Sequence, residues 1–315
     1  MVPWTGALTL VLDGQEVAST AVTRRFVADD IDVSDIREQG IVATLFRPMA
    51  VAPLPGVIVL TGSGGGLNNR QAALLASHGF VTLALAYFGI EHLPAQLVDI
   101  PLEYLETGIE WLADHPAVGG RPVGVVGPSK GGELALLLGA TFPRVKAVVA
   151  YVPSGLVHQG ISFDANRVSS SWTHRGEPLP FVSMTPGALQ PSTPLRLREG
   201  YLSTLDDPAR VAAATIAVER TSGAILQLSG EDDGMWPSTP FAALVEQRLT
   251  NRAFPHEHRH VSYPGAGHSF IIPNTPTPPI PGATFEFGGT PAGTAHAAEA
   301  SWRETISFLD RHLGG

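Results

Sequence analysis

The first fifty residues follow the pattern of short β-strands. Every second residue from Leu8 to Leu12 is leucine, and Asp13-Gly14 directly after them is a typical hairpin turn. Val17 to Val27 and Gly40 to Phe46 are further segments rich in β-formers. We therefore expect a short N-terminal extension of antiparallel strands.

From about residue 57 the pattern changes to short, continuous apolar runs separated by helical segments. Continuous apolar runs are typical of parallel strands that are buried on both faces. The runs are Val57 to Thr61, Val81 to Ala86, Val123 to Val126, Ala147 to Val152, Ile225 to Ser229 and Arg259 to Tyr263. The helical segments are Asn69 to His78, Leu102 to Asp114, Lys130 to Ala140 and Thr239 to Leu249. The pattern predicts an α/β protein with a mostly parallel central sheet and helices on both faces.

Two stretches interrupt this alternation. Residues 154–222 show no clear strand and are expected to form a lid-like insertion that shapes a pocket. Residues 272–295 contain six prolines and four glycines, so we expect an ordered loop beside the site, followed by a last amphipathic helix from about Ala297 to His312. We divide the chain into an N-terminal β extension, residues 1–50, and a catalytic domain, residues 51–315.

Composition narrows the classes of function. The 315 residues are 44% hydrophobic and 16% charged, which is too apolar for a disordered chain. The formal net charge of −9 leaves no basic face for phosphate, so neither nucleic-acid binding nor membrane insertion is expected. The absence of cysteine excludes a cysteine nucleophile, thiolate metal sites and disulfides.

The sequence shows no targeting or spanning segment. The N-terminus lacks a basic stretch followed by an apolar run, and the longest apolar stretch, Phe80 to Phe88, is far shorter than the roughly 20 residues that cross a bilayer. We expect a cytoplasmic protein.

Residues Gly127 to Gly131 match the pattern G-x-S-x-G. An apolar run precedes them and a helical segment follows, which is the context of a nucleophile elbow. In such a turn the two flanking glycines avoid collisions with neighbouring elements, and the serine oxygen is lifted toward the start of the next helix. We predict Ser129 as the nucleophile.

A serine nucleophile needs a base, and the base needs an acid that orients it. The strand ending near Ser229 is followed by Asp232 and Asp233, and the strand ending at Tyr263 is followed by His268. These positions suit an acid and a base at the carboxyl ends of two strands. We predict His268 as the base and favour Asp233 as the acid, because Pro237 follows it four residues later, with Asp232 as the alternative.

Acyl transfer also requires two amide donors for the oxyanion. We expect one to be the backbone N–H of Lys130, directly after the nucleophile. The other is expected from the glycine-rich loop after the first parallel strand, at Ser63 or Gly64. This loop does not match a dinucleotide-binding fingerprint, since Leu67 stands where the last glycine would be.

Other polar residues have simpler interpretations. His256, His258 and His260 would share one face of a strand, but a metal site is not favoured because Glu257 points the other way. The Lys130 side chain could meet an acidic ligand or be held by a carboxylate such as Glu133. Trp172 and Trp236 could line an acyl pocket or pack in the core.

Several motifs together resemble one family, the acyl-CoA thioester hydrolases and bile acid-CoA:amino acid N-acyltransferases, related to the dienelactone hydrolases. The segments that carry the resemblance are Pro55–Leu60, Ala73–Phe80, Leu83–Phe88, Gly127–Gly131, Tyr151–Gly155, Gly230–Asp233, Trp236–Ser238 and Tyr263–His268. The resemblance spans about residues 40–313. It implies an α/β-hydrolase fold, acyl thioester substrates and a triad at Ser129, Asp233 and His268, because the second aspartate of the pair is the family's acid.

Three departures from the family shape the expected function. Only about 50 residues precede the catalytic domain, where members usually carry a whole β-sandwich. The nucleophile is Ser, as in the thioesterases, and not the Cys of the amino-acid-conjugating members. The acidic chain has 2 Lys and 18 Arg, so no dedicated clamp for coenzyme A phosphates is evident.

We therefore expect a serine hydrolase of acyl thioesters, bound to coenzyme A or to an acyl carrier protein, with no metal or organic cofactor. An acyltransferase or cyclase that uses an amine or alcohol acceptor, and a carboxylesterase, are the alternatives. A binding protein that has lost turnover is disfavoured by the intact Ser, Asp and His.

Overall fold

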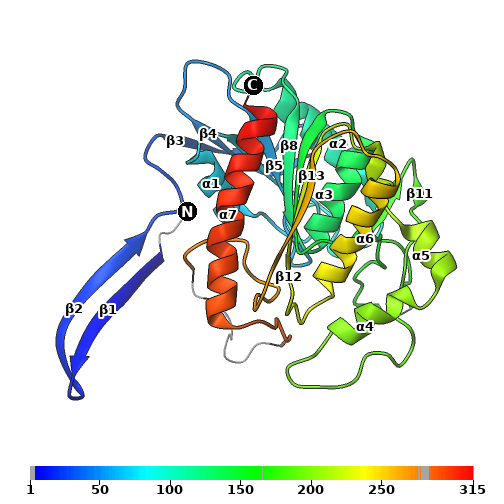
Figure 1. The fold of residues 1–315 in the computed structure, drawn as a ribbon. Helices are drawn as coiled ribbons and strands as arrows, with labels where there is room; N and C mark the ends of the chain where they lie inside the picture. Colours follow the sequence, from blue (N-terminus) through cyan, green and yellow to red (C-terminus); the bar gives the residue numbers. More distant parts are fainter. Residues whose placement is uncertain (1–3, 165, 276, 278–283, 315) are drawn as a thin grey trace.

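The computed structural model describes residues 4–164, 166–275, 277 and 284–314. Its centre is an eight-stranded sheet in the order β13-β12-β9-β8-β5-β6-β4-β3 (Figure 1). The strands are β3 (Ile31–Ile36), β4 (Val42–Pro48), β5 (Gly56–Val59), β6 (Val81–Ala86), β8 (Val123–Pro128), β9 (Val145–Tyr151), β12 (Ala224–Gly230) and β13 (His258–Tyr263). The six strands from β13 to β6 run parallel, while β4 pairs antiparallel with both β6 and β3.

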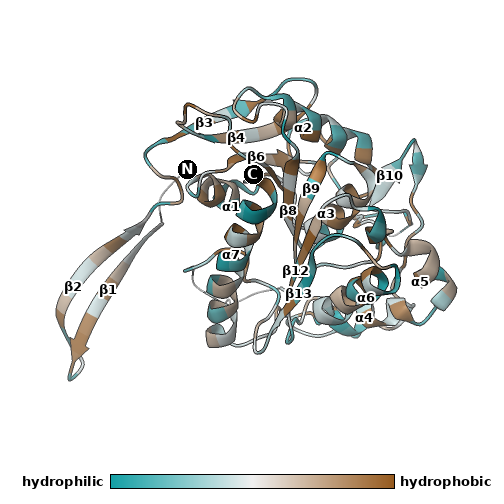
Figure 2. Ribbon diagram, turned by 45° about the horizontal axis from the view of Figure 1, so that its top comes forward, coloured by the Kyte–Doolittle hydropathy of each residue, from teal (hydrophilic) through white to brown (hydrophobic). Residues whose placement is uncertain are grey.

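Helices cover both faces of this sheet. On one face lie α1 (Asn69–Ala76) and α7 (Pro291–Leu313), and on the other lie α2 (Leu102–Asp114), α3 (Lys130–Thr141) and α6 (Ser238–Asn251). Val57 and Val59 pack toward α1 and α7, whereas Ile58 and Leu60 pack toward the other three helices. Both faces of the sheet are therefore buried, which is why its strands read as continuous apolar runs and are the most hydrophobic part of the ribbon in Figure 2.

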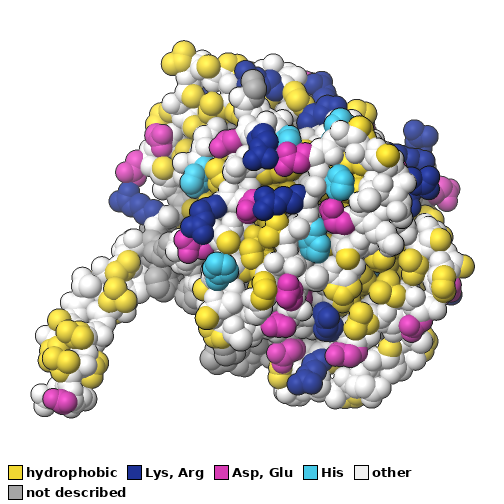
Figure 3. Space-filling view, viewed as in Figure 1, with side chains coloured by type: hydrophobic (Ala, Val, Ile, Leu, Met, Phe, Trp, Pro, Cys, Tyr) yellow, Lys and Arg dark blue, Asp and Glu magenta, His cyan; other side chains and the backbone are white. Residues whose placement is uncertain are grey.

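The N-terminal strands divide between two places. β1 (Trp4–Leu12) and β2 (Gln15–Arg24) form a separate antiparallel ribbon that projects from the body and exposes apolar side chains (Figures 1 and 3). β3 and β4 instead complete the central sheet at its edge. The predicted boundary at residue 50 thus falls after two strands that already belong to the sheet.

The predicted insertion, residues 154–222, contains more regular structure than its sequence pattern indicated. β10 (Trp172–His174) pairs with β11 (Glu177–Pro178) and with β7 (Ile100–Pro101). The helical pieces are α4 (Arg198–Leu202), η1 (Ser203–Leu205), α5 (Pro208–Ala214) and η2 (Val218–Arg220). These strands are only two or three residues long, too short to produce an alternating pattern.

The prediction for the C-terminal segment was wrong at one end. We expected the proline-rich loop to reach residue 295, but α7 begins at Pro291. Proline is compatible with the first turn of a helix because its missing N–H has no partner there, and the Thr290 side chain caps the helix by accepting from the Gly293 N–H. The predicted loop residues 276 and 278–283 lie outside the described residues. No helix in the described part of the chain has the length and apolar character needed to cross a membrane.

Candidate active site

Ser129 stands between β8 and α3 with φ 56° and ψ −121°, a conformation that L-residues seldom adopt. Its two flanking glycines are required by close backbone contacts. A Cβ atom on Gly127 would lie 2.1 Å from the carbonyl oxygen of Gly131, and a Cβ on Gly131 would lie 2.1 Å from that of Thr61. The turn is thus a strained elbow that presents the serine at the start of a helix.

His268 and Asp233 are brought together from two different loops. Asp233 follows β12 and His268 follows β13, and the His268 Nδ1 atom lies 2.8 Å from Asp233 Oδ2. The Asp233 carboxylate is fully buried, and its other oxygen accepts hydrogen bonds from the backbone N–H groups of Met235 and Trp236. Because a carboxylate only accepts here, Nδ1 carries the proton and Nε2 is left as the basic nitrogen.

The alternative acid, Asp232, is placed differently. Its side chain is exposed, and its backbone N–H donates to the carbonyl of Ala266. The ion pair with His268 is made by Asp233 alone among the described carboxylates. The geometry therefore favours the second aspartate of the pair.

The segment predicted as an ordered loop beside the site holds both of these loops in place. The carbonyl of Phe287 accepts from the backbone N–H groups of Gly234 and His268. Gly288 packs so closely that a Cβ on Gly267 would lie 2.2 Å from its carbonyl oxygen. This part of the predicted loop does lie beside the site. The glycine pair Gly288-Gly289 is the sequence feature that could have indicated the close contact, and both glycines have positive φ in the structure.

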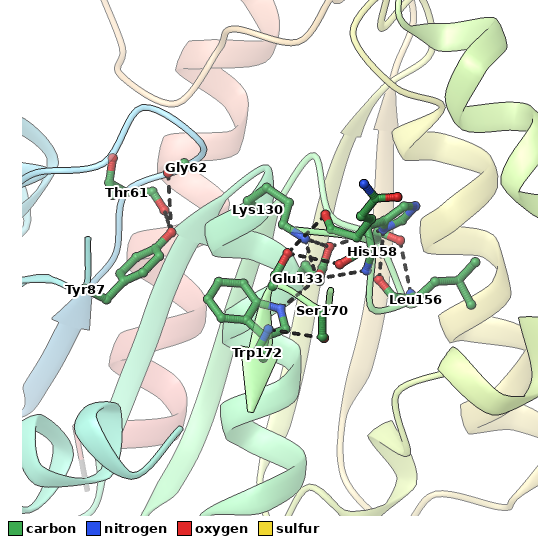
Figure 4. Close-up of polar contacts among 12 residues, drawn as sticks. Thr61, Gly62, Tyr87, Lys130, Glu133, Leu156, His158, Ser170 and Trp172 are labelled. Carbon is green, nitrogen blue, oxygen red and sulfur yellow. Dashed lines mark hydrogen bonds and ion pairs between the residues drawn. The ribbon is translucent and has the colours of Figure 1, made fainter. Parts of the chain in front are cut away.

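The loop after β5 lies against the nucleophile. A Cβ on Gly62 would lie 3.4 Å from the Ser129 Cβ. Ser63 and Gly64 are exposed, and neither their backbone N–H groups nor that of Lys130 donates to another described group. Tyr87 fixes the base of this loop, because its hydroxyl donates to the carbonyl of Thr61 over 2.9 Å (Figure 4).

The Lys130 side chain is turned into the protein. Its Nζ lies 2.7 Å from both carboxylate oxygens of Glu133, one helical turn away, and both side chains are buried (Figure 4). Burial raises the pKa of the Glu133 carboxyl, but Lys130 and hydrogen bonding from His158 outweigh it and lower that pKa. The structure thus answers the question left by the sequence: Lys130 is held by Glu133.

Two residues of the insertion complete the surroundings of Glu133. The indole N–H of Trp172 donates to Glu133 Oε1 over 2.7 Å, and His158 Nδ1 lies 3.2 Å from Oε2. The Trp172 ring also packs between Lys130 and Tyr87. One buried cluster therefore connects the elbow helix, the insertion and the loop after β5.

Trp236 lies next to the predicted base. Its ring centroid is 6.2 Å from that of His268 and 5.4 Å from that of His158, and its N–H donates to the carbonyl of Val152. The two tryptophans considered in the sequence thus differ: Trp236 borders the site, whereas Trp172 supports it from behind.

Two of the three alternating histidines have polar protein partners. His258 Nδ1 lies 2.8 Å from Glu246 and His260 Nε2 lies 2.7 Å from the Ser229 hydroxyl. No group of three or more potential metal ligands occurs within the described ranges.

The mostly parallel sheet with helices on both faces, and the strained serine between β8 and α3, define an α/β-hydrolase fold. Solved structures agree on the fold. The chain superposes on an alpha/beta hydrolase enzyme from a Medee basin deep-sea metagenome library with a TM-score of 0.54 and 15% identity, covering 91% of this chain and all of that one. An acylaminoacyl peptidase from Pyrococcus horikoshii gives a TM-score of 0.55 at 11% identity, covering 90% of this chain and 41% of that one.

Within this fold the family is defined by sequence. Residues 100–315 match the model of the BAAT / acyl-CoA thioester hydrolase C-terminal family, and the chain belongs to that family. It is 31% identical over 309 residues to the mitochondrial acyl-coenzyme A thioesterase 2 of Mus musculus, covering 96% of this chain and 65% of the relative. It is 30% identical over 320 residues to the peroxisomal succinyl-coenzyme A thioesterase of the same species, covering 96% of this chain and 72% of the relative. The chain thus spans about two thirds of the length of these relatives.

Proposed function

We propose that this protein is a serine hydrolase of acyl thioesters that works through an acyl-enzyme on Ser129. The observation that carries the proposal is the hydrogen bond between His268 and the buried Asp233, in a chain whose strained Ser129 follows β8. Family membership and relatives named as acyl-coenzyme A thioesterases support a thioester as the substrate.

In the proposed mechanism His268 Nε2 takes the proton from the Ser129 hydroxyl as the oxygen attacks the acyl carbonyl. The backbone N–H groups of Lys130 and of Ser63 or Gly64 stabilise the oxyanion that forms. The thiol leaves with the proton from His268, and water, deprotonated by the same imidazole, then releases the acid. Asp233 fixes the tautomer of His268 and stabilises its charged form.

The nature of the thiol is a separate part of the proposal. We favour coenzyme A over a carrier protein, since two of the relatives are named for coenzyme A thioesters. We keep the predicted cytoplasmic location, although the names of these relatives place them in mitochondria and peroxisomes.

The test is intact-protein mass spectrometry of wild type and Ser129→Ala after incubation with acyl-CoAs and aryl esters, together with an assay for released thiol or phenol. An acyl adduct on wild type only, with thiol and free acid as products, is the expected result. Undiminished thiol release by Ser129→Ala would contradict the proposal. Reaction with aryl esters alone would keep the nucleophile and discard the thioester, and an amide or ester product with added amine or alcohol would indicate acyl transfer.

A further inference from the structure

A cavity lies within the insertion, and Ser129 is not among the residues that line it. It has a volume of about 310 Å³, and its walls combine apolar side chains such as Val182 and Met184 with the hydroxyl-bearing Tyr201 and Thr204. His158 also lines this cavity, although its side chain is only 2% exposed. Asp164 and Arg167 line it too, and Arg167 is paired with Asp99. The cavity therefore combines a buried imidazole with walls of mixed polar and apolar character.

The protonation of His158 follows from its partners. Nδ1 lies 3.2 Å from Glu133 Oε2 and 3.1 Å from the carbonyl of Leu156, and both of these only accept. Nδ1 therefore carries a proton. Burial lowers the pKa of the imidazole despite Glu133, so the ring is neutral near pH 7 and Nε2 is a bare acceptor.

That acceptor is unpaired. Nε2 is buried and has no hydrogen-bond partner within the described ranges. Rings of Tyr201, Trp236 and Phe241 surround the imidazole, with centroids 5.2 to 5.4 Å away, and these contacts are made by ring faces and edges. An unpaired buried acceptor is costly, so the site is suited to a ligand that brings a donor.

The ligand's donor is expected to be neutral. Beside His158, the carboxylate of Glu133 is already neutralised by Lys130, which removes the attraction for a cation at this end of the cavity, and a bare imidazole nitrogen does not attract an anion. Burial raises the pKa of Tyr201 to about 12, so its hydroxyl keeps its proton and can donate to an oxygen of the same ligand.

We propose that this cavity binds a ligand through a neutral O–H or N–H group, with His158 Nε2 as the acceptor. This inference rests on the proposed function for the identity of the ligand as a thioester. Two parts of such a substrate carry neutral donors: a hydroxylated acyl chain, and the amides and hydroxyl of a pantetheine arm. Trp236, which contacts both His158 and His268, places the cavity next to the predicted catalytic residues.

The experiment measures binding without turnover in full-length Ser129→Ala, by calorimetry. The ligands are decanoyl thioesters with and without a hydroxyl at carbon 3 or carbon 10, each on coenzyme A and on the short thiol N-acetylcysteamine. The same set is measured in Ser129→Ala/His158→Asn, because asparagine keeps a donor near Glu133 and removes the Nε2 acceptor. Tyr201→Phe, made in the same Ser129→Ala background, is the second variant, since it removes only a hydroxyl and leaves Glu133 untouched.

A hydroxylated ligand is expected to bind about tenfold more tightly than its parent, and His158→Asn is expected to abolish that difference. A His158-dependent preference for coenzyme A over the short thiol, with no effect of the acyl hydroxyl, would support the cavity and assign the donor to pantetheine. If His158→Asn does not fold, Tyr201→Phe must reduce the same preference severalfold.

The inference is overturned if the His158 and Tyr201 variants bind every ligand pair in the same affinity ratio as Ser129→Ala does, or if no ligand binds to any of these proteins. Wild-type thioester hydrolysis combined with unchanged ratios would reject the cavity and keep the proposed function. If the preference between paired ligands depends on His158 but the wild-type protein hydrolyses no thioester, the binding role of the cavity is kept and the proposed function is rejected.

Discussion

The indole N–H of Trp172 donates to Glu133 Oε1 over 2.7 Å, joining the insertion to the helix that begins directly after Ser129. Glu133 also holds Lys130, whose backbone N–H is a predicted oxyanion donor. The insertion and the elbow are therefore not independent units, and a change in one is expected to reach the other.

Breaking this cluster should have graded effects. Trp172→Phe keeps an aromatic side chain but removes the indole N–H that donates to a buried carboxylate, so it should lower the free energy of unfolding by about 1 to 3 kcal/mol. Glu133→Gln leaves the buried Lys130 ammonium without its counter-charge and should cost about 3 to 5 kcal/mol. Urea unfolding followed by circular dichroism measures both. Equal stability of Glu133→Gln and wild type would show that the ion pair is not important for the fold.

The adjacent Asp232 and Asp233 provide a matched pair of variants that tests which of them orients His268. Asp233→Asn should lower kcat by about 10³ to 10⁴-fold, because an amide can donate to Nδ1 and so favour the wrong tautomer of His268. Asp232→Asn should leave kcat near the wild-type value, since that side chain is exposed. Thiol release under saturating thioester compares the two. A larger loss in Asp232→Asn would reverse the assignment.

Two glycines near Ser129 differ in the space around them. Gly131→Ala should prevent normal folding, because its Cβ would lie 2.1 Å from the Thr61 carbonyl oxygen. Gly64→Ala should fold normally, since no atom lies within 4 Å of a Cβ there. Soluble yield and thermal melting distinguish them. A Gly131→Ala protein that melts like wild type would contradict the close packing at the elbow.

The buried His158 should make the fold sensitive to mild acid. Its pKa is lowered in the folded state from the ordinary 6.5, so the unfolded chain binds more protons and stability falls as the pH drops below about 6.5. The slope from one such group is at most about 1.4 kcal/mol per pH unit.

Comparing wild type with His158→Asn tests whether His158 causes this acid sensitivity. His158→Asn should flatten the dependence between pH 6.5 and 5, a range in which Glu133 stays charged because its pKa is lowered. Burial also lowers the pKa of His260, but this residue is present in both proteins, so its contribution cancels in the comparison. Parallel curves of unfolding free energy against pH would show that His158 is not the group responsible.

The fold and most of the site residues could be predicted because local patterns specify them. Buried parallel strands produce continuous apolar runs, and the elbow needs its glycines within five residues of sequence. The positions of Ser129, Asp233 and His268 at strand ends followed from that pattern, and the structure brings the last two together. Their catalytic roles stay predictions.

The parts that could not be predicted depend on contacts between distant segments. Trp172 reaches Glu133 across 39 residues of sequence, and Phe287 holds Gly234 and His268, which lie in two different loops. Neither contact leaves a periodic signal. The start of α7 was missed for another reason, because Pro291 was counted as a helix breaker when it stands at a position where proline is favoured.

The placement of Trp236 against two imidazoles makes this residue a natural optical reporter. Its indole touches His268 on the catalytic side and His158 on the cavity side, so its emission is exposed to the charge of one ring and to occupancy beside the other. With the other tryptophans of the chain replaced by phenylalanine, Trp236 would be the single tryptophan fluorophore. Its emission would then report acylation and ligand binding in the same experiment.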